Sequence, residues 1–342
     1  MKVGLIYNMR WENTEEPLEP PGGMPLDSQA EWDSPETIAA IQYALGQRHE
    51  VISINAAEDV WEMLRKNRPD IVFNIAEGGV GPCREGHIPS ILEYFGIPYT
   101  ASDPLTLNIC LDKSRAKEIL TYHGFSTARF HVITDLDLSC NTLKYPLVVK
   151  PLYEGSSKGI FNNSLVHTRE EMIERASWLM QSYDEPALVE EFLPGREFTV
   201  AILGNGAKAR VLPIVEILFD SLPEEVNPIY SFEAKWIWDQ SCNPLDIFEC
   251  PARIGEELKL EIEKLCLGAY RVLRCRDWCR VDVRLDAEGR PHILELNPLP
   301  GVLPKPEDNS CFPKAARAAG MRYDQLINEV LDIACERYGL LQ

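Results

Sequence analysis

No stretch of this sequence approaches the ~20 uninterrupted apolar residues of a membrane-spanning helix, so we do not expect a membrane protein. Basic residues are also scarce. The 34 Lys and Arg residues stand against 53 Asp and Glu residues, which gives a formal net charge of −19. Because nucleic acids are bound by basic surfaces, this balance argues against a nucleic-acid partner. A small nucleotide is still compatible with it, since one phosphate site needs only a few local cations.

Cysteine pairs with metal-binding spacing are absent as well. The ten cysteines are scattered, and none forms a C-x-x-C pair that would indicate a zinc site. We therefore expect reduced, partly buried cysteines in a cytoplasmic protein. The first residues, Met1 to Tyr7, become polar too soon for a signal peptide and predict a core strand instead.

The length of 342 residues suits two or three domains. Strand and helix signals alternate through residues 1–105, which predicts an N-terminal α/β domain with an open, mostly parallel sheet. A loop rich in glutamate and proline, residues 10–35, follows the first strand, where α/β proteins place ligand-binding segments. A solvated surface loop is the alternative. The G-x-G-x-x-G of a dehydrogenase does not follow that strand. Two further blocks cover residues 106–187 and 188–342.

Polar residues near the ends of two strands carry the clearest chemistry. Alternation places Arg280, Asp282 and Arg284 on one face of a strand, and a D-A-E-G turn leads to the strand with Glu295 and Asn297. If the two strands form a hairpin, Asp282, Glu295 and Asn297 converge. Three oxygen ligands without sulfur or imidazole suit Mg²⁺. A polar face balanced by the two arginines is the alternative.

A second element joins an apolar strand to a turn rich in glycine and serine. Lys150 ends the strand, and the loop from Gly155 to Gly159 contains Ser156 and Ser157. Free backbone N–H groups, small hydroxyls and a lysine are groups that bind phosphate oxygens. The spacing is not that of a P-loop, and taken alone the segment is equally well a hairpin turn.

A third strand, A-L-V-E-E-F-L-P-G, ends in Glu190 and Glu191, which could bond an adenine amine or ribose hydroxyls. The order of all these elements resembles the ATP-grasp superfamily and, more narrowly, the D-alanine–D-alanine ligase family. The resemblance runs from about residue 68 to 335. The matching stretches are IPYTASDPLTLNICLDKSRAK, YPLVVKPLYEGSSKG, LVEEFLPGREFTVAIL, FEAKW, CRVDVRLDAEG and ILELNPLPG.

The resemblance implies an N-terminal α/β domain (1–105) followed by a two-lobed, α+β ATP-grasp fold (106–187 and 188–342). It also implies an ATP-dependent carboxylate–amine ligase whose cofactors are ATP and two Mg²⁺ ions, with Mn²⁺ as an alternative metal. Transfer of the γ-phosphoryl group makes a carboxylate susceptible to an amine, because phosphate is a better leaving group than oxide. The expected partners are small amino-acid or amine substrates and, as in related ligases, a second copy of the chain.

Carried over position by position, the resemblance places Lys113 and Lys150 on the ATP phosphates and Glu197 on the ribose. The loop 155–159 would close over the triphosphate, and Arg280 would steady the acyl phosphate. The nucleotide-binding set is Lys113, Lys150, Ser156, Ser157, Glu190, Glu191, Leu193, Glu197 and Lys235. The metal ligands are Asp282, Glu295 and Asn297. The catalytic residues are Arg280, Lys235 and Ser156.

The N-terminal domain departs from the family pattern. The family's His-Gly-Gly strand end is Tyr7-Asn8-Met9-Arg10 here, and its Glu-Asp-Gly is Arg84-Glu85-Gly86. The family glutamate that binds the first substrate's ammonium has two candidate replacements, Glu31 and Asp33. Trp236 stands where the family has the Tyr or Phe partner of Ser156.

The segment after N-x-x-P-G departs too. The family has a carboxylate-binding serine there, whereas this chain has Lys305-Pro306-Glu307-Asp308 and no serine before Ser310. An acidic stretch repels a free carboxylate, so we expect a second substrate other than simple D-alanine, such as a larger amino acid, a peptide or an amine. A true D-alanine–D-alanine ligase with unusual loops and a non-catalytic ATP-binding regulator are the alternatives.

Overall fold

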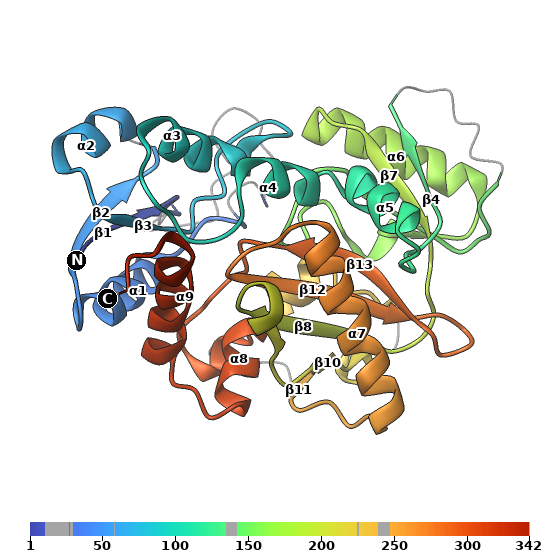
Figure 1. The fold of residues 1–342 in the computed structure, drawn as a ribbon. Helices are drawn as coiled ribbons and strands as arrows, with labels where there is room; N and C mark the ends of the chain where they lie inside the picture. The colour runs from blue at the N-terminus through green and yellow to red at the C-terminus, as the bar shows by residue number, and fades with distance from the viewer. Residues whose placement is uncertain are drawn as a thin grey trace.

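The structure is a computed structural model, and it describes residues 1–10, 27, 30–57, 59–134, 142–223, 226–238 and 247–341 (Figure 1). The structure does not describe the side chains of residues 221 and 236–238. Most of the acidic loop expected at 10–35 therefore lies outside the described residues, as do Cys140 and Cys242. Within the described ranges, three β-sheets organise the chain.

The N-terminal sheet is parallel throughout, as predicted, with strand order β2-β1-β3. Its strands are β1 (Lys2–Tyr7), β2 (Glu50–Asn55) and β3 (Ile71–Asn74). Its helices are α1 (Pro35–Gly46), α2 (Val60–Asn67) and α3 (His87–Phe95). Ser34 caps α1 by accepting a hydrogen bond from Thr37 N, and Pro35 supplies the φ angle of the first helical turn. The strand expected at I-P-Y-T is reduced to a single bridge between Val72 and Tyr99.

The central sheet is antiparallel, with strand order β4-β7-β5-β6. Its strands are β4 (Phe130–Ile133), β5 (Leu147–Pro151), β6 (Leu165–Val166) and β7 (Ala187–Glu191). The helices of this part of the chain are α4 (Pro104–Leu111) and α5 (Lys113–Tyr122), whose apolar residues join the core of the C-terminal sheet, and α6 (Arg169–Tyr183). Asp112 separates α4 from α5 and caps α5 through its carboxylate, which fixes where Lys113 starts the helix. The apolar face of α6 packs on this sheet.

The C-terminal sheet is antiparallel, with the path β11-β10-β8-β12-β13 and β9 paired to β8. Its strands are β8 (Glu197–Leu203), β9 (Arg210–Val211), β10 (Val215–Ile217), β11 (Phe248–Glu249), β12 (Trp278–Leu285) and β13 (Pro291–Asn297). The helices are α7 (Glu256–Val272), α8 (Cys311–Ala318), α9 (Tyr323–Tyr338) and a π-helix, Glu233–Trp238. The predicted hairpin of β12 and β13 is present.

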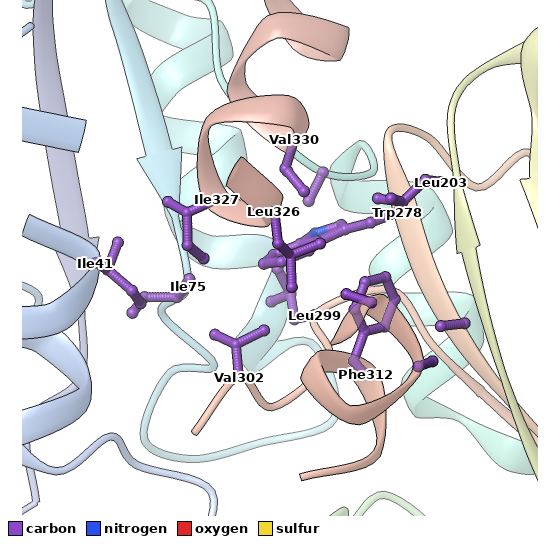
Figure 2. Packing of buried hydrophobic residues seen from close by; sticks show 14 of the residues in the cluster. Ile41, Ile75, Leu203, Trp278, Leu299, Val302, Phe312, Leu326, Ile327 and Val330 are labelled. Carbon is purple, nitrogen blue, oxygen red and sulfur yellow. The ribbon is translucent and has the colours of Figure 1, made fainter. Parts of the chain in front are cut away.

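A shared hydrophobic core joins the N-terminal and C-terminal sheets. Figure 2 shows Trp278 of β12 surrounded by apolar side chains from α8, α9 and the segment after β13. Trp278 is completely buried and makes edge-on ring contacts with Phe73 and Phe312. Because α9 packs against α1 as well, the C-terminal helices fix the N-terminal domain against the C-terminal sheet (Figure 1).

We propose to keep the division into three units and to place the second boundary after β7. Residues 187–191 pair with β4 and β5 of the central sheet, and β8 begins the C-terminal sheet at Glu197. The turn at 192–196 therefore separates the two ATP-grasp lobes better than residue 187 does. Among the described residues, no helix is long and apolar enough to cross a membrane.

Candidate active site

A cavity of about 260 Å³ lies between the three sheets, and every residue of the predicted site lines it. These residues are Lys113, Lys150, Ser156, Ser157, Glu190, Glu191, Leu193, Glu197, Lys235, Arg280, Asp282, Glu295 and Asn297. They come from the second and third sequence blocks and span more than half of the chain. The fold thus brings together in space what the sequence analysis grouped by motif order.

Lys150 is held at one end of the cavity by a buried carboxylate. Its Nζ lies 2.7 Å from Glu190 Oε1, and Lys117 Nζ lies 3.3 Å from Glu190 Oε2. All three side chains are buried. Burial lowers the pKa of Lys150, but Glu190 and Glu295 outweigh it, so the pKa is raised and the ammonium stays charged. Glu190 thus orients the ammonium groups of Lys150 and Lys117, whereas the resemblance placed it in the nucleotide-binding set beside adenine.

Lys113 connects this end to the acids of the C-terminal hairpin. It is the first residue of α5, and its Nζ donates to the carbonyl of Glu154 and lies 3.9 Å from Glu295 Oε2. Lys117 stands one helical turn further along the same face of α5. That spacing was the signal in the sequence for Lys117, which the sequence analysis missed.

Asp282 and Glu295 face each other across the β12–β13 hairpin, and Arg280 is paired with Asn297. Asn297 Nδ2 lies 3.3 Å from Asp282 Oδ2 and 3.4 Å from Glu295 Oε1. Arg280 Nη2 is 2.9 Å from Asp282 Oδ2. Burial raises the pKa of Glu295, but Lys113, Lys150 and Arg280 reverse the shift and hold it below its usual range. Both carboxylates and the carboxamide therefore converge, as the hairpin predicted.

This set has the composition of a hard-cation site. It offers two carboxylates and one amide, and a half-turn of the Asn297 amide presents its oxygen to the same point. Among the described residues, no group of three or more His, Cys, Asp or Glu side chains is arranged to hold a metal. The hairpin set is consistent with that finding, because it has only two acids.

The Gly/Ser loop forms a tight turn and no helix, in line with its sequence. Ser156 and Ser157 both have positive φ angles, 50° and 61°. Such angles turn successive backbone N–H groups to one side, which suits anion binding. Ser157 Oγ donates to the Tyr230 carbonyl, so the π-helix region contacts the loop.

Glu31, one of the two candidates left open for the ammonium site, is fully engaged within the protein. Its Oε1 accepts hydrogen bonds from Arg84 Nη2 (2.7 Å) and Gly155 N (2.6 Å), and Lys158 Nζ lies 3.3 Å from Oε2. Burial raises the pKa of Glu31, but Arg84 and Lys158 outweigh this and lower it. Arg84 and Lys158 also pair with Glu154. Glu31 thus fastens the phosphate loop to the N-terminal domain.

Asp33, the other candidate, lines the cavity together with Glu77 and Glu85. None of these three carboxyl groups forms an ion pair or hydrogen bond through its side chain within the described part of the chain. Burial raises the pKa of Asp33 to about 7, although Arg10 opposes the shift. Burial and the neighbouring acids raise the pKa of Glu77 well above its usual range. This end of the cavity therefore holds three carboxyl groups that form no direct ion pair within the described part of the chain.

The predicted ribose contact, Glu197, lies at the start of β8 and pairs with Arg284 of β12, with 2.7 Å between Oε2 and Nη1. Arg284 also stacks on Phe192, with its guanidinium carbon 4.6 Å from the ring centroid. Glu191 accepts a hydrogen bond from Lys144 N (2.9 Å), and Leu193 is buried beside it. This wall offers backbone groups and an apolar surface to a flat ring.

Lys235 enters the cavity from the π-helix. Burial lowers its pKa to about 8, and the nearby Arg280 adds to the shift. An anion placed between Lys235 and Arg280 relieves this repulsion, so the pair is suited to a phosphoryl group. Trp236 follows it, but its side chain lies outside the described ones.

The segment after N-x-x-P-G, where the sequence departs from the family pattern, contributes only some of its residues to the cavity wall. Glu307 is exposed, whereas Asp308 and Ser310 line the cavity. Ser310 is buried at the N-terminus of α8, where Oγ accepts from Leu303 N and lies 3.1 Å from the Gly301 carbonyl. Lys305, Pro306 and Glu307 are thus exposed to solvent, whereas a serine lies on the cavity wall.

Comparisons with known proteins agree with this geometry. The family described as "D-ala D-ala ligase C-terminus" matches residues 118–332. A D-alanine–D-alanine ligase of Cupriavidus pinatubonensis is 35% identical over 268 residues, which cover 78% of this chain and 76% of that protein. The enzyme of that name from Pelotomaculum thermopropionicum is 34% identical over 300 residues (84% and 87%). An uncharacterized protein of Sinorhizobium fredii is 37% identical over 268 residues (78% and 75%).

A solved structure matches the whole fold. The crystal structure of D-alanine–D-alanine ligase from Bacillus anthracis complexed with ATP superposes with a TM-score of 0.74 and 25% sequence identity, covering 99% of both chains. The match includes the N-terminal domain, where the sequence resemblance was weaker. The chain therefore belongs to the D-alanine–D-alanine ligase family, within the ATP-grasp superfamily of ATP-dependent carboxylate–amine ligases.

Proposed function

We propose that this protein joins a carboxylate to an amine through an acyl phosphate, on amino-acid or peptide substrates. The observation that carries the proposal is the single cavity in which Lys150, Lys235 and Arg280 face the two carboxylates Asp282 and Glu295. Phosphoryl transfer needs both kinds of group together: cations for the phosphates and acids for a metal ion. The cytoplasm, which supplies ATP, is the compartment that suits this reaction.

In this proposal ATP lies along the face between the central and C-terminal sheets. The base contacts the backbone of 191–193, and the ribose lies near Glu197, which would exchange part of its pairing with Arg284 for a sugar hydroxyl. Lys113 and Lys150 take the phosphates, and the Gly155–Gly159 turn covers them. The loop is already fixed to Glu31 through Gly155 N, so closure would begin from a defined position.

Asp282, Glu295 and Asn297 are the proposed ligands of Mg²⁺. A bound Mg²⁺ would neutralise charge on the phosphates during transfer. Arg280 pairs with Asp282 in this structure, and it would be available to the acyl phosphate if a metal ion held that carboxylate. Burial lowers the pKa of Lys235 to about 8, and a phosphoryl group beside it would stabilise its charged form. Loop closure excludes water from the acyl phosphate.

Two residues of the segment before α8 bear on the second substrate. Asp308 lines the cavity, as the acidic segment predicted, and disfavours a free carboxylate nearby. Ser310 lines it as well and offers a hydroxyl. A true D-alanine–D-alanine ligase is therefore the second candidate, favoured by Ser310 and by the names of the relatives.

A paired substrate screen tests the proposal. Purified protein with Mg²⁺-ATP would be offered amino acids and amines two at a time, with phosphate release and product mass as readouts. We expect phosphate release that requires both substrates and a product lighter than their sum by one water. Efficient dipeptide formation from D-alanine alone would establish the second candidate. ATP binding without turnover for any pair would show a non-catalytic regulator instead.

A further inference from the structure

Lys117 of α5 is a completely buried lysine behind the wall of the cavity. The described residues that line the cavity do not include it. Its Nζ has two partners on different elements: Glu190 Oε2 of β7 lies at 3.3 Å, and Thr127 Oγ1, shortly before β4, lies at 2.7 Å. A buried ammonium is costly unless it is paired, and one carboxylate is sufficient for that. The contact with Thr127 is therefore more than charge compensation.

Thr127 connects Lys117 to β13. Its Oγ1 donates to the carbonyl of Ile293 (2.9 Å), and Ile293 N donates to the carbonyl of Ser126 (2.9 Å). Because β13 ends the path of the C-terminal sheet, residues 126 and 127 cover its outer edge. A continuous series of contacts therefore crosses from the central sheet to the C-terminal sheet, in the order Lys150, Glu190, Lys117, Thr127 and Ile293.

Ile293 lies at a β-bulge that sets the direction of Glu295. Asp282 of β12 is opposite Glu295, whereas the next residue, Val283, is opposite Ile293, so Leu294 is the extra residue of β13. Residues two apart on a regular strand share a face. Here Ile293 packs with Val283 in the apolar core, and Glu295 lines the cavity. The bulge is thus what turns Glu295 toward Asp282.

We propose that Lys117 is a positioning residue that couples the nucleotide site to the metal site. Through Glu190 it holds Lys150 in place for the phosphates, and through Thr127 it holds the bulge that directs Glu295 to the metal ion. The inference rests on the proposed function, because it requires that Lys150 binds phosphate and Glu295 binds metal. Groups behind a metal ligand fix its orientation, and their loss typically costs about 10–100-fold in metal affinity.

Binding of adenylyl imidodiphosphate, a non-hydrolysable ATP analogue, measures this coupling without turnover. Its affinity for the full chain would be determined by calorimetry in EDTA and again with saturating Mn²⁺, and the ratio of the two affinities is the metal enhancement. The complex of Mn²⁺ with the analogue in solution is the same for every variant, so a change in the enhancement reports on the protein. We expect Thr127→Val to lower the enhancement about tenfold or more and to leave the affinity in EDTA unchanged. Thr127→Ser keeps the hydroxyl and should keep the enhancement.

Lys117→Met should lower both quantities. The affinity in EDTA should fall about tenfold, because Glu190 would then neutralise Lys150 alone. The enhancement should fall as it does in Thr127→Val. The double variant should lose no more enhancement than Lys117→Met does, because both substitutions break the same series of contacts.

Thr121→Val, exposed on α5, and Lys264→Met, exposed on α7, are the matched controls and should change neither quantity. An enhancement unchanged in Thr127→Val would overturn the proposal. An additive loss in the double variant would overturn it too, since that is the result of two independent local effects. Equal affinity of the unmodified protein in EDTA and in Mn²⁺ would also contradict it. If Lys117→Met does not fold, Thr127→Val and Thr127→Ser still decide.

The two levels of inference fail separately. Ligation of any substrate pair, with an enhancement unchanged in Thr127→Val, refutes the role of Lys117 and retains the ligase. A lowered enhancement in Thr127→Val and Lys117→Met, without ATP turnover by the unmodified protein for any substrate pair, supports the role of Lys117 and refutes the ligase.

Discussion

Arg84 Nη2 lies 2.7 Å from Glu31 Oε1, and both side chains are almost completely buried at 3% and 4% exposure. Arg84 occupies a position where the family pattern has glutamate, and its partner Glu31 is one of the two candidates for the ammonium-binding acid. Arg84 thus neutralises the Glu31 carboxylate, which would otherwise face a substrate. The pair also links the N-terminal domain to the phosphate loop through Gly155 N.

Breaking this pair should destabilise the fold. Arg84→Met leaves Glu31 and Glu154 with only Lys158, and removing one partner of a buried ion pair costs about 3–5 kcal/mol. Urea unfolding followed by fluorescence measures the loss. Arg48→Met removes an exposed pair with Asp332 and should cost less than about 1 kcal/mol. Equal losses of unfolding free energy for the two substitutions would show that the buried pair stabilises the fold no more than the exposed pair does.

Glu190 should be required for ATP binding as well as for stability. Glu190→Gln removes the carboxylate that pairs with both Lys117 and Lys150 and leaves these two buried lysines without a direct ion pair. We expect the KM for ATP to rise about tenfold or more and the unfolding free energy to fall by about 3–5 kcal/mol. Glu118→Gln, an exposed acid on α5 that pairs with Arg115, is the control and should change neither quantity. A normal KM in a folded Glu190→Gln protein would refute the role of Glu190 in positioning Lys150.

Asp33 should make stability fall as pH rises. Its pKa is about 7 in the folded protein, mainly because of burial, against about 3.9 when unfolded. Between these values the folded state binds a proton that the unfolded state has released, so the contribution of Asp33 to stability declines from pH 4 to 7 and is constant above. Asp33→Asn removes this decline.

Unfolding free energies of both proteins, measured from pH 4 to 8 without ligands, give the comparison. The difference in favour of Asp33→Asn should grow up to pH 7 and then level off. A difference that shrinks over this interval would mean that Asp33 is stabilised in its charged form. Glu261→Gln, on the exposed face of α7, should follow the unmodified protein throughout.

Glu295 should be needed for chemistry more than for folding. Glu295→Ala removes one of the two carboxylates that face each other on β12 and β13, and we expect ATP turnover to fall by about 10²–10³-fold or more. The Mg²⁺ concentration needed for half-maximal binding of an ATP analogue should rise too. Glu288→Gln, exposed in the turn of the same hairpin, should change neither. Turnover retained by Glu295→Ala would exclude the proposed metal site.

The sequence was sufficient for the groups whose geometry follows from local rules. Alternation along a strand and a short turn place Asp282, Glu295 and Asn297 together, because an antiparallel hairpin leaves little freedom in register. The same holds for the lysine that ends β5 and for the turn after it. Lys117 was within reach of the same reasoning, through its helical spacing from Lys113.

Other features depended on contacts between distant segments. No local rule indicates that Glu31 pairs with Arg84 and Lys158, or that Glu197 pairs with Arg284, because each pair joins elements from different parts of the chain. No local rule places Ser310 on the cavity wall either, because its position depends on where α8 packs in the fold.

The sequence by itself determined the reaction class, because the order of its motifs resembles the family and the groups proposed to bind phosphate and metal lie on strands and turns that local periodicity defines. Only the tertiary structure decided which acids remain available to a substrate. Whether a carboxylate is free depends on which cations pack against it, and that is fixed when the N-terminal sheet, α9 and the C-terminal sheet come together around Trp278.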